Sequence, residues 1–334
     1  MYLSSFIHRE ELFHIAQRWF CGRMEPDDAL KLTQILICDG FVLGQTLQRV
    51  TRTLLGRICA DCMHEEPIRI KGQLRDALCR SPRVFTPRTR ELCREYRANP
   101  EYYYAEVPIN GALYTDSNHA LWGVYRIKRP RRIAEKANRK IAQWIFERVR
   151  HRAQEMALER AHRYDIPLDR LVTPENEMVE EFIQAEKVIA RSFSDGTMSL
   201  DPSVMTIHDV GGIKVVADRE DLDFLEKSLS ANSDWKVLDR ENFRGDYRAV
   251  SLILQVPWER EEVCRQYRET RSWRKYLNRG IGEDELKKGL EPLLENAEAH
   301  LNLELILSTF EDLVESELGN SIHEERITAQ REAR

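Results

Sequence analysis

The sequence lacks any apolar run of the roughly 20 residues that a helix needs to cross a bilayer. It also lacks a strong charge of one sign, because 51 Lys and Arg side chains stand against 56 Asp and Glu side chains, for a net charge of -5. Any polyanion site must therefore be a local patch. The first twenty residues do not show the basic-then-apolar order of a secretory signal. We expect a cytoplasmic protein that does not insert into membranes.

The seven cysteines form no disulfide or metal pattern. An odd number in a chain of 334 residues does not suit the disulfide framework of a small secreted domain. The one cluster, CADCMH, holds Cys59, Cys62 and His64, but no second C-x-x-C supplies the four ligands that structural zinc requires. We interpret the cysteines as buried free thiols.

The order of apolar residues changes along the chain. Helical spacing dominates residues 1–115, which contain no catalytic constellation. A long helix with a basic start begins near residue 130, and a second helix follows near residue 174. Short β-branched strands then alternate with helices from about residue 211. We predict an α+β fold in which a small mixed sheet is flanked by helices, with a mainly helical N-terminal region and a loose tail at 327–334.

The stretch MTIHDVGGIKVV allows two interpretations of the pair His208 and Asp209. A phosphohydrolase metal site needs at least one further His and one further Asp, and the other histidines show no such pattern. In the second interpretation Asp209 is a carboxylate at the mouth of a strand, where Gly211 and Gly212 let a ligand approach the backbone closely. We favour the second, in which His208 is incidental.

Glu304 is the candidate for a second carboxylate on a neighbouring strand. In LNLELILS, the side chains of Leu303, Leu305 and Leu307 fall on one face by period two, and Glu304 falls on the other. An Asp and a Glu on adjacent strands offer the hard oxygen ligands that Mg²⁺ takes together with waters and substrate phosphates. A solvent-facing role for Glu304 remains the alternative.

Two further stretches could recognise a nucleotide. Residues 126–140 hold eight Lys and Arg side chains against the single acid Glu135, at the start of a helix, which suits phosphate binding. A solvated basic face or an RNA contact is the alternative. Tyr247 and Arg248 enter the longest apolar strand, where a ring beside an arginine can stack on a nucleobase. A core tyrosine is the alternative there.

Taken in order, these stretches resemble the RelA/SpoT family of alarmone synthetases, which transfer pyrophosphate from ATP to the 3′-hydroxyl of GDP or GTP. The family's R-x-K element and S-I-x-x-K helix are matched in RIKRPRRIAEKANRK by Arg126, Lys128, Ile133, Lys136 and Lys140, with Arg132 at the Ser position. Its D-x-x-G-x-R element, whose Asp holds Mg²⁺, is matched in DVGGIK by Asp209 and Gly212, with Lys214 in place of Arg.

The later motifs of the family are matched in part. In G-Y-R-S-x-H the Tyr stacks on guanine, and GDYRAVS keeps Tyr247 and Arg248 but has Ala249 and Ser251 for the Ser and His. E-I-Q-I-R-T and E-L-G-x-x-x-H are matched in ELILST and ELGNSIH by Glu304, Thr309, Glu317, Leu318, Gly319 and His323.

The resemblance covers about residues 120–326. It implies a nucleotidyltransferase-like synthetase domain at 116–326, with a helical insertion at about 141–200. It also implies that Asp209 and Glu304 hold Mg²⁺ and that Glu304 is the base that takes the proton of the acceptor hydroxyl. His323 would have an orienting role. The ATP-binding and acceptor-binding residues that it implies are Arg126, Lys128, Lys136, Lys140 and Lys214 for ATP, and Tyr247 and Arg248 for the acceptor. No His-Asp hydrolase motif occurs in residues 1–115, so we expect no alarmone-degrading domain.

Departures from the family motifs leave the acceptor open. Lys214 keeps the charge of the family's Arg but lacks its forked pair of donors. The Gln and Arg of E-I-Q-I-R and the Ser and His of G-Y-R-S-x-H are also replaced, which removes polar contacts to the substrate. A guanine nucleotide is the first expectation. Two alternatives stand beside it: a toxin-type enzyme that acts on adenine nucleotides or on the tRNA 3′ end, and a degenerate protein that only binds nucleotide.

Overall fold

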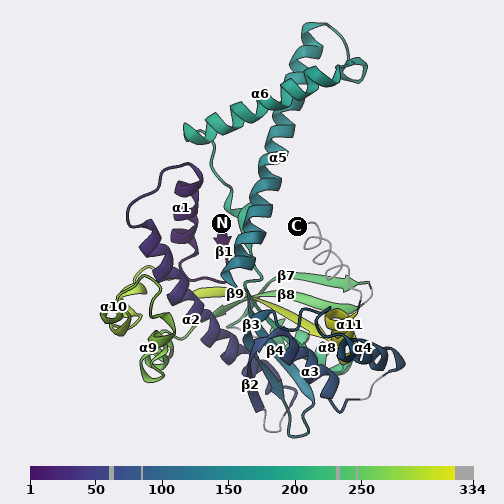
Figure 1. Ribbon diagram of the computed structural model, residues 1–334, viewed down its shortest axis with the longest axis vertical. Coiled ribbons are helices and arrows are strands. Elements are labelled where there is room, and N and C mark those ends of the chain that lie inside the picture. The colour runs from purple at the N-terminus through teal and green to yellow at the C-terminus, as the bar shows by residue number, and fades with distance from the viewer. Residues whose placement is uncertain (60–63, 84–85, 231–233, 246, 320–334) are drawn as a thin grey trace. The chain divides into compact units, whose positions relative to one another are not determined.

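The computed structural model describes the chain except for residues 60–63, 84–85, 231–233, 246 and 320–334 (Figure 1). The fold is α+β with a mixed sheet, as predicted. Within the described residues, no helix has the length and apolarity needed to pass through a membrane. His323 lies outside the described residues.

Contacts divide the chain into two units. The first comprises Met1–Leu3, Arg9–Leu32 and Pro130–Ile207. The second comprises Ser4–His8, Thr33–Arg129 and His208–Arg334. Each unit therefore joins segments that are distant in sequence, whereas we predicted a single boundary at residue 115.

The second unit contains a seven-stranded sheet in the order β2-β3-β4-β6-β9-β8-β7. Its strands are β2 (His64–Ile70), β3 (Pro108–Thr115), β4 (Leu121–Ile127), β6 (Gly211–Val216), β7 (Lys236–Arg244), β8 (Arg248–Pro257) and β9 (His300–Ser308). Neighbours pair antiparallel except β6 and β9, which run parallel. Two of these strands, β2 and β3, fall in the N-terminal region, where we predicted mainly helix.

Different helices cover the two faces of this sheet. Helix α2 (Asp28–Leu55) covers one face, since a Cβ on Gly211 would meet the side chains of Leu43 and Leu47, and one on Gly123 would meet Leu55. Helix α8 (Arg219–Ser230) lies along β7 and β9. The segment between β8 and β9 holds α9 (Arg260–Glu269) and α10 (Glu283–Lys287), with short 3-10 turns.

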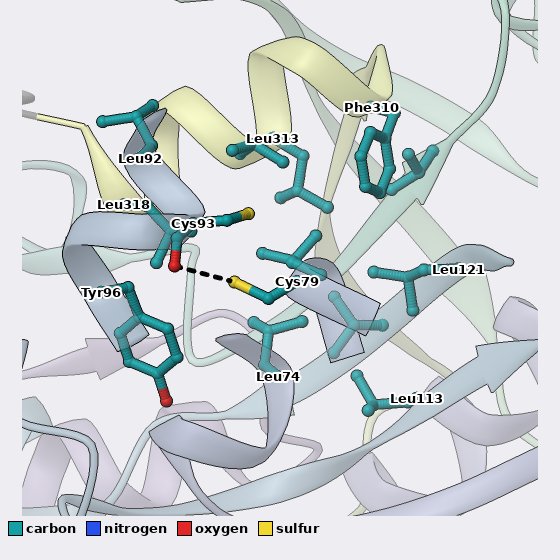
Figure 2. Close-up of a cluster of buried hydrophobic side chains, with 14 of the residues drawn as sticks. Leu74, Cys79, Leu92, Cys93, Tyr96, Leu113, Leu121, Phe310, Leu313 and Leu318 are labelled. Atoms are coloured by element: carbon teal, nitrogen blue, oxygen red, sulfur yellow. Dashed lines mark hydrogen bonds between the residues drawn. The ribbon is translucent and has the colours of Figure 1, made fainter. Parts of the chain in front are cut away.

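The opposite face is covered in part by α3 (Lys71–Arg80), α4 (Pro87–Ala98) and α11 (Phe310–Leu318). Their apolar side chains meet Leu113 of β3 and Leu121 of β4 in one buried cluster (Figure 2). Cys79 and Cys93 lie within it, with the Cys79 thiol 4.0 Å from the Cys93 carbonyl oxygen. The cysteines of the described residues are free thiols, and most of them are buried, as the sequence predicted.

The first unit is mainly helical. It holds α1 (Arg9–Phe20), α5 (Pro130–Arg163), α6 (Glu175–Ser194) and α7 (Pro202–Met205), with a two-stranded sheet of β1 (Tyr2–Leu3) and β5 (Thr206–Ile207). Helix α6 packs on α5 (Figure 1), and the Trp144 and Phe193 rings meet with centroids 5.5 Å apart. These are the two helices that the sequence predicted after residue 130.

Candidate active site

The two candidate carboxylates belong to neighbouring segments of the second unit. Asp209 lies two residues before β6, and Glu304 lies on β9, the parallel neighbour of β6. Gly212 and Glu304 are paired, and a Cβ on Gly212 would lie 3.2 Å from a carboxylate oxygen of Glu304. Glycine at this position therefore leaves room for the carboxylate. Leu303 and Leu305 are buried while Glu304 is half-buried, which confirms the predicted period-two pattern.

Lys128 reaches Asp209 from the end of β4. Its ammonium forms an ion pair with the Asp209 carboxylate and donates a hydrogen bond to the Asp209 carbonyl oxygen at 2.6 Å. The Lys128 backbone N–H donates to the carbonyl oxygen of Val210 at 2.8 Å, which continues the pairing of β4 with β6. Two residues that are eighty positions apart in sequence are thus held together by the sheet.

Two other predicted cations, Arg126 on β4 and Lys214 on β6, converge on Glu317 of α11. A guanidinium nitrogen of Arg126 and the Lys214 ammonium each lie 2.8 Å from the same Glu317 carboxylate oxygen. A third cation, the fully buried Arg75, donates from Nε to the Glu317 carbonyl oxygen at 3.0 Å. These contacts bind α11 and α3 to the centre of the sheet.

The charges in this cluster shift its pKa values. Burial alone would raise the pKa of Glu317, but the positive charges of Arg126 and Lys214 outweigh it and hold the pKa well below its ordinary value. Burial lowers the pKa of Lys214, and Glu317 opposes that change. Sequence reasoning had matched Glu317 to a motif without giving it a role. Its position between Leu313, Val314 and Leu318 on the buried side of a helix was the available signal.

Tyr247 lies near the carboxylates of Glu304 and Glu317. Burial raises the pKa of its hydroxyl, and the charges of Glu317 and Glu304 raise it further. The Phe243 ring lies beside it, with centroids 6.2 Å apart and ring planes 30° apart. A half-buried ring near two carboxylates can stack on a flat ligand.

Arg248 is the first residue of β8 and directly follows Tyr247. Arg248 lines a groove of about 710 Å³ with Val250 and Leu307, whose side chains face α8. The charged residues of this groove balance, three against three: Arg219, Arg244 and Arg248 against Asp223, Glu226 and Asp312. The groove contains neither Asp209 nor Glu304 and does not define an anion site by its charge.

Lys136 and Lys140 belong to α5 in the first unit. The Lys140 ammonium donates to the Val204 carbonyl oxygen at 3.1 Å. The residues that the second unit brings together are Arg126, Lys128, Asp209, Lys214, Tyr247 and Glu304, with Glu317 added by the structure.

The histidines do not form a phosphohydrolase site in the described residues. The Nδ1 atom of His208 lies 2.9 Å from the Ser4 hydroxyl, and the Ser5 hydroxyl donates to the His208 carbonyl oxygen. A different group, His8 with Cys38 and Asp39, is buried and close enough to be considered for a metal. The ring Nδ1 of His8 lies only 2.6 Å from Asp39, a hydrogen-bond length below the spacing of about 3.3 Å that two ligands keep around one zinc. We interpret it as a buried hydrogen-bonded pair of His8 and Asp39.

Comparisons of the chain with protein-family models, with curated proteins and with solved structures find no match.

Proposed function

We propose that the protein is a Mg²⁺-dependent pyrophosphokinase with a nucleotidyltransferase-like synthetase domain. It would transfer pyrophosphate from ATP to the 3′-hydroxyl of a nucleotide, with GDP and GTP as the first acceptors. The main support is the strand order β4-β6-β9, which gathers the R-x-K, D-x-x-G-x-K and Glu304 segments at the centre of one sheet. These are the segments that carry the resemblance to the alarmone synthetases.

The donor set suits the metal in this proposal. Asp209 and Glu304 are hard oxygen donors on neighbouring segments, and Gly212 leaves space at Glu304. Mg²⁺ held there would neutralise phosphate charge and polarise the β-phosphoryl group.

The cations of the site would stabilise the triphosphate. Arg126 and Lys214 share the single charge of Glu317, so the three groups together keep one net positive charge. Glu317 also fixes both cations before ATP arrives, and preorganised charge is the main source of catalysis in phosphoryl transfer. Lys128 adds positive charge beside Asp209. Lys136 and Lys140, which belong to the first unit, are ATP-binding residues by the resemblance alone.

In the proposed reaction the acceptor 3′-oxygen bonds to the β-phosphorus of ATP. The bond between that phosphorus and the α–β bridging oxygen breaks, and AMP leaves. The proton of the 3′-hydroxyl passes to the Glu304 carboxylate. Tyr247 would stack on the acceptor base, and its neighbour Phe243 would lie at the edge of that stack.

The test is incubation of the protein with [γ-³²P]ATP and, separately, GDP, GTP, ADP and tRNA. Label on an acceptor together with release of AMP indicates pyrophosphate transfer, and label released only as free pyrophosphate indicates nucleotidyl transfer. We expect Asp209→Asn and Glu304→Gln each to lower the rate at least about 100-fold. Asp284→Asn and Glu295→Gln are exposed carboxylates of the same types and serve as matched controls. Full turnover in Asp209→Asn and Glu304→Gln would refute the assignment.

Binding without transfer is the second candidate. It is favoured by one observation: Arg126, Lys128 and Lys214 each already have a carboxylate partner in the protein. A non-hydrolysable ATP analogue that raises the melting temperature, together with no labelled product from any acceptor, would support this candidate over the enzyme.

A further inference from the structure

Exposed apolar side chains gather on α5, α6 and the segment that joins them. Of the seventeen large hydrophobic side chains exposed in the described chain, ten lie between residues 146 and 188. Single exposed apolar residues are ordinary, but a concentration in one segment marks an interaction surface.

The exposed apolar residues of α6 are separate from those that pack inside the unit. Phe182, Ala185 and Ile189 contact the buried cluster of the first unit. Val179 and Ile183, which lie one helical turn apart, are 51% and 43% exposed. Helix α6 therefore has a second apolar stripe that its own unit leaves uncovered.

The charges of the two helices are opposite. Helix α5 carries ten Lys and Arg residues against four Glu, whereas α6 carries five Glu against two basic residues. One ion pair between the two helices forms within the chain, between Arg160 and Glu181 at 2.9 Å. Other charges remain exposed, including Arg148 and Arg150 on α5 and Glu180 and Glu186 on α6. The surface of this helix pair is thus complementary to itself.

We propose that two copies of this chain associate through α5 and α6, with α6 of each copy packed on α5 of the other. A two-fold interface uses the same surface patch on both copies. The acidic α6 of each copy can therefore pack on the basic α5 of the other copy. Val179 and Ile183 supply the apolar centre, and the charged residues form the rim. Helices of 34 and 20 residues are about 51 and 30 Å long, enough for an interface of about 800 Å² per copy.

The test is sedimentation velocity of the full chain over a concentration series. We expect a dimer, and we expect the double variant Val179→Asp with Ile183→Asp to raise its dissociation constant at least about 100-fold, because two charges would enter the apolar centre. Phe224→Asp, at a residue 55% exposed on α8, is the matched control and should leave the dimer unchanged. Far-UV circular dichroism shows whether each variant keeps its helices.

A second variant alters only the charges. Glu180→Lys with Glu186→Lys keeps the apolar stripe and should raise the dissociation constant about tenfold, an effect that weakens in high salt. Adding Arg150→Glu to the same chain should restore part of the affinity. A wild-type chain that stays monomeric up to about 100 µM overturns the proposal, as does a dimer that Val179→Asp with Ile183→Asp leaves intact. An unchanged constant in the charge variant contradicts the packing of α6 on α5.

Discussion

Glu317 and Asp39 are two buried carboxylates of the second unit whose pKa values move in opposite directions. Glu317 is 7% exposed, and its pKa lies well below the ordinary value. Asp39 is 1% exposed, and its pKa is raised. Burial penalises both charges, so the difference comes from their partners. Two cations, Arg126 and Lys214, face Glu317 directly, whereas Asp39 has His8.

The two sites also differ in what they join. Asp39 on α2 is hydrogen-bonded to Nδ1 of the His8 ring at 2.6 Å and accepts a hydrogen bond from the His8 backbone N–H at 2.9 Å, which ties an N-terminal segment to a helix. Glu317 ties a helix to two strands at the centre of the sheet. The comparison indicates that a buried carboxylate stays charged where several cations converge on it. Where a single histidine is the ionisable partner, burial raises the pKa of the carboxylate and favours its protonated form.

The largest effect is expected from Glu317→Gln. The change removes the carboxylate charge that Arg126 and Lys214 share, and removal of one partner from a buried ionic cluster costs about 3 kcal/mol or more. Urea denaturation should show this loss in the free energy of unfolding. Glu315→Gln is a suitable control, because its partner Arg88 is half-exposed and such a pair contributes about 1 kcal/mol or less. Equal losses in the two variants would remove the distinction between the sites.

A smaller effect is expected from Asp39→Asn. The amide keeps one acceptor oxygen and loses the other, so the cost should be that of one buried hydrogen bond, about 1 to 2 kcal/mol. Because burial already disfavours the charged form of Asp39, loss of the charge itself adds little. The measurement is the same urea titration at pH 7. A loss as large as that of Glu317→Gln would show that the His8–Asp39 pair is as strongly charged as the Glu317 cluster.

The pH dependence should distinguish the two carboxylates by sign. Glu317 has a lowered pKa, so its stabilising contribution is present above the ordinary value of 4.5 and is lost as pH falls through the folded pKa. Asp39 has a raised pKa, so its contribution is present below the ordinary value of 3.8 and is lost as pH rises through the folded pKa.

The stability differences between wild type and variant should therefore change in opposite directions between pH 3 and pH 7. The difference for Glu317→Gln should grow as pH rises, and that for Asp39→Asn should shrink. Urea titrations at several pH values measure both. If both stability differences changed in the same direction with pH, burial and not the number of charged partners would control the pKa values of Glu317 and Asp39.

Local patterns in the sequence predicted several parts of the second unit. The alternation in LNLELILS placed Glu304 opposite the buried leucines, and the structure confirms it because side chains on a strand alternate by geometry alone. The two helices after residue 130 followed from helical spacing. By contrast, nothing local indicated that His8 would meet Asp39, thirty-one residues away on another element.

Propensity and periodicity act over a few neighbouring positions, so local patterns were enough to predict the α+β class, the strand faces and the residue types of the candidate site. Which of those residues meet depends on strand order and helix packing. The order β4-β6-β9 brings Lys128 to Asp209 and places Gly212 beside Glu304, and the packing of α11 adds Glu317 to Arg126 and Lys214. These contacts join residues from about 80 to 190 positions apart, so they depend on strand order, which no short pattern encodes.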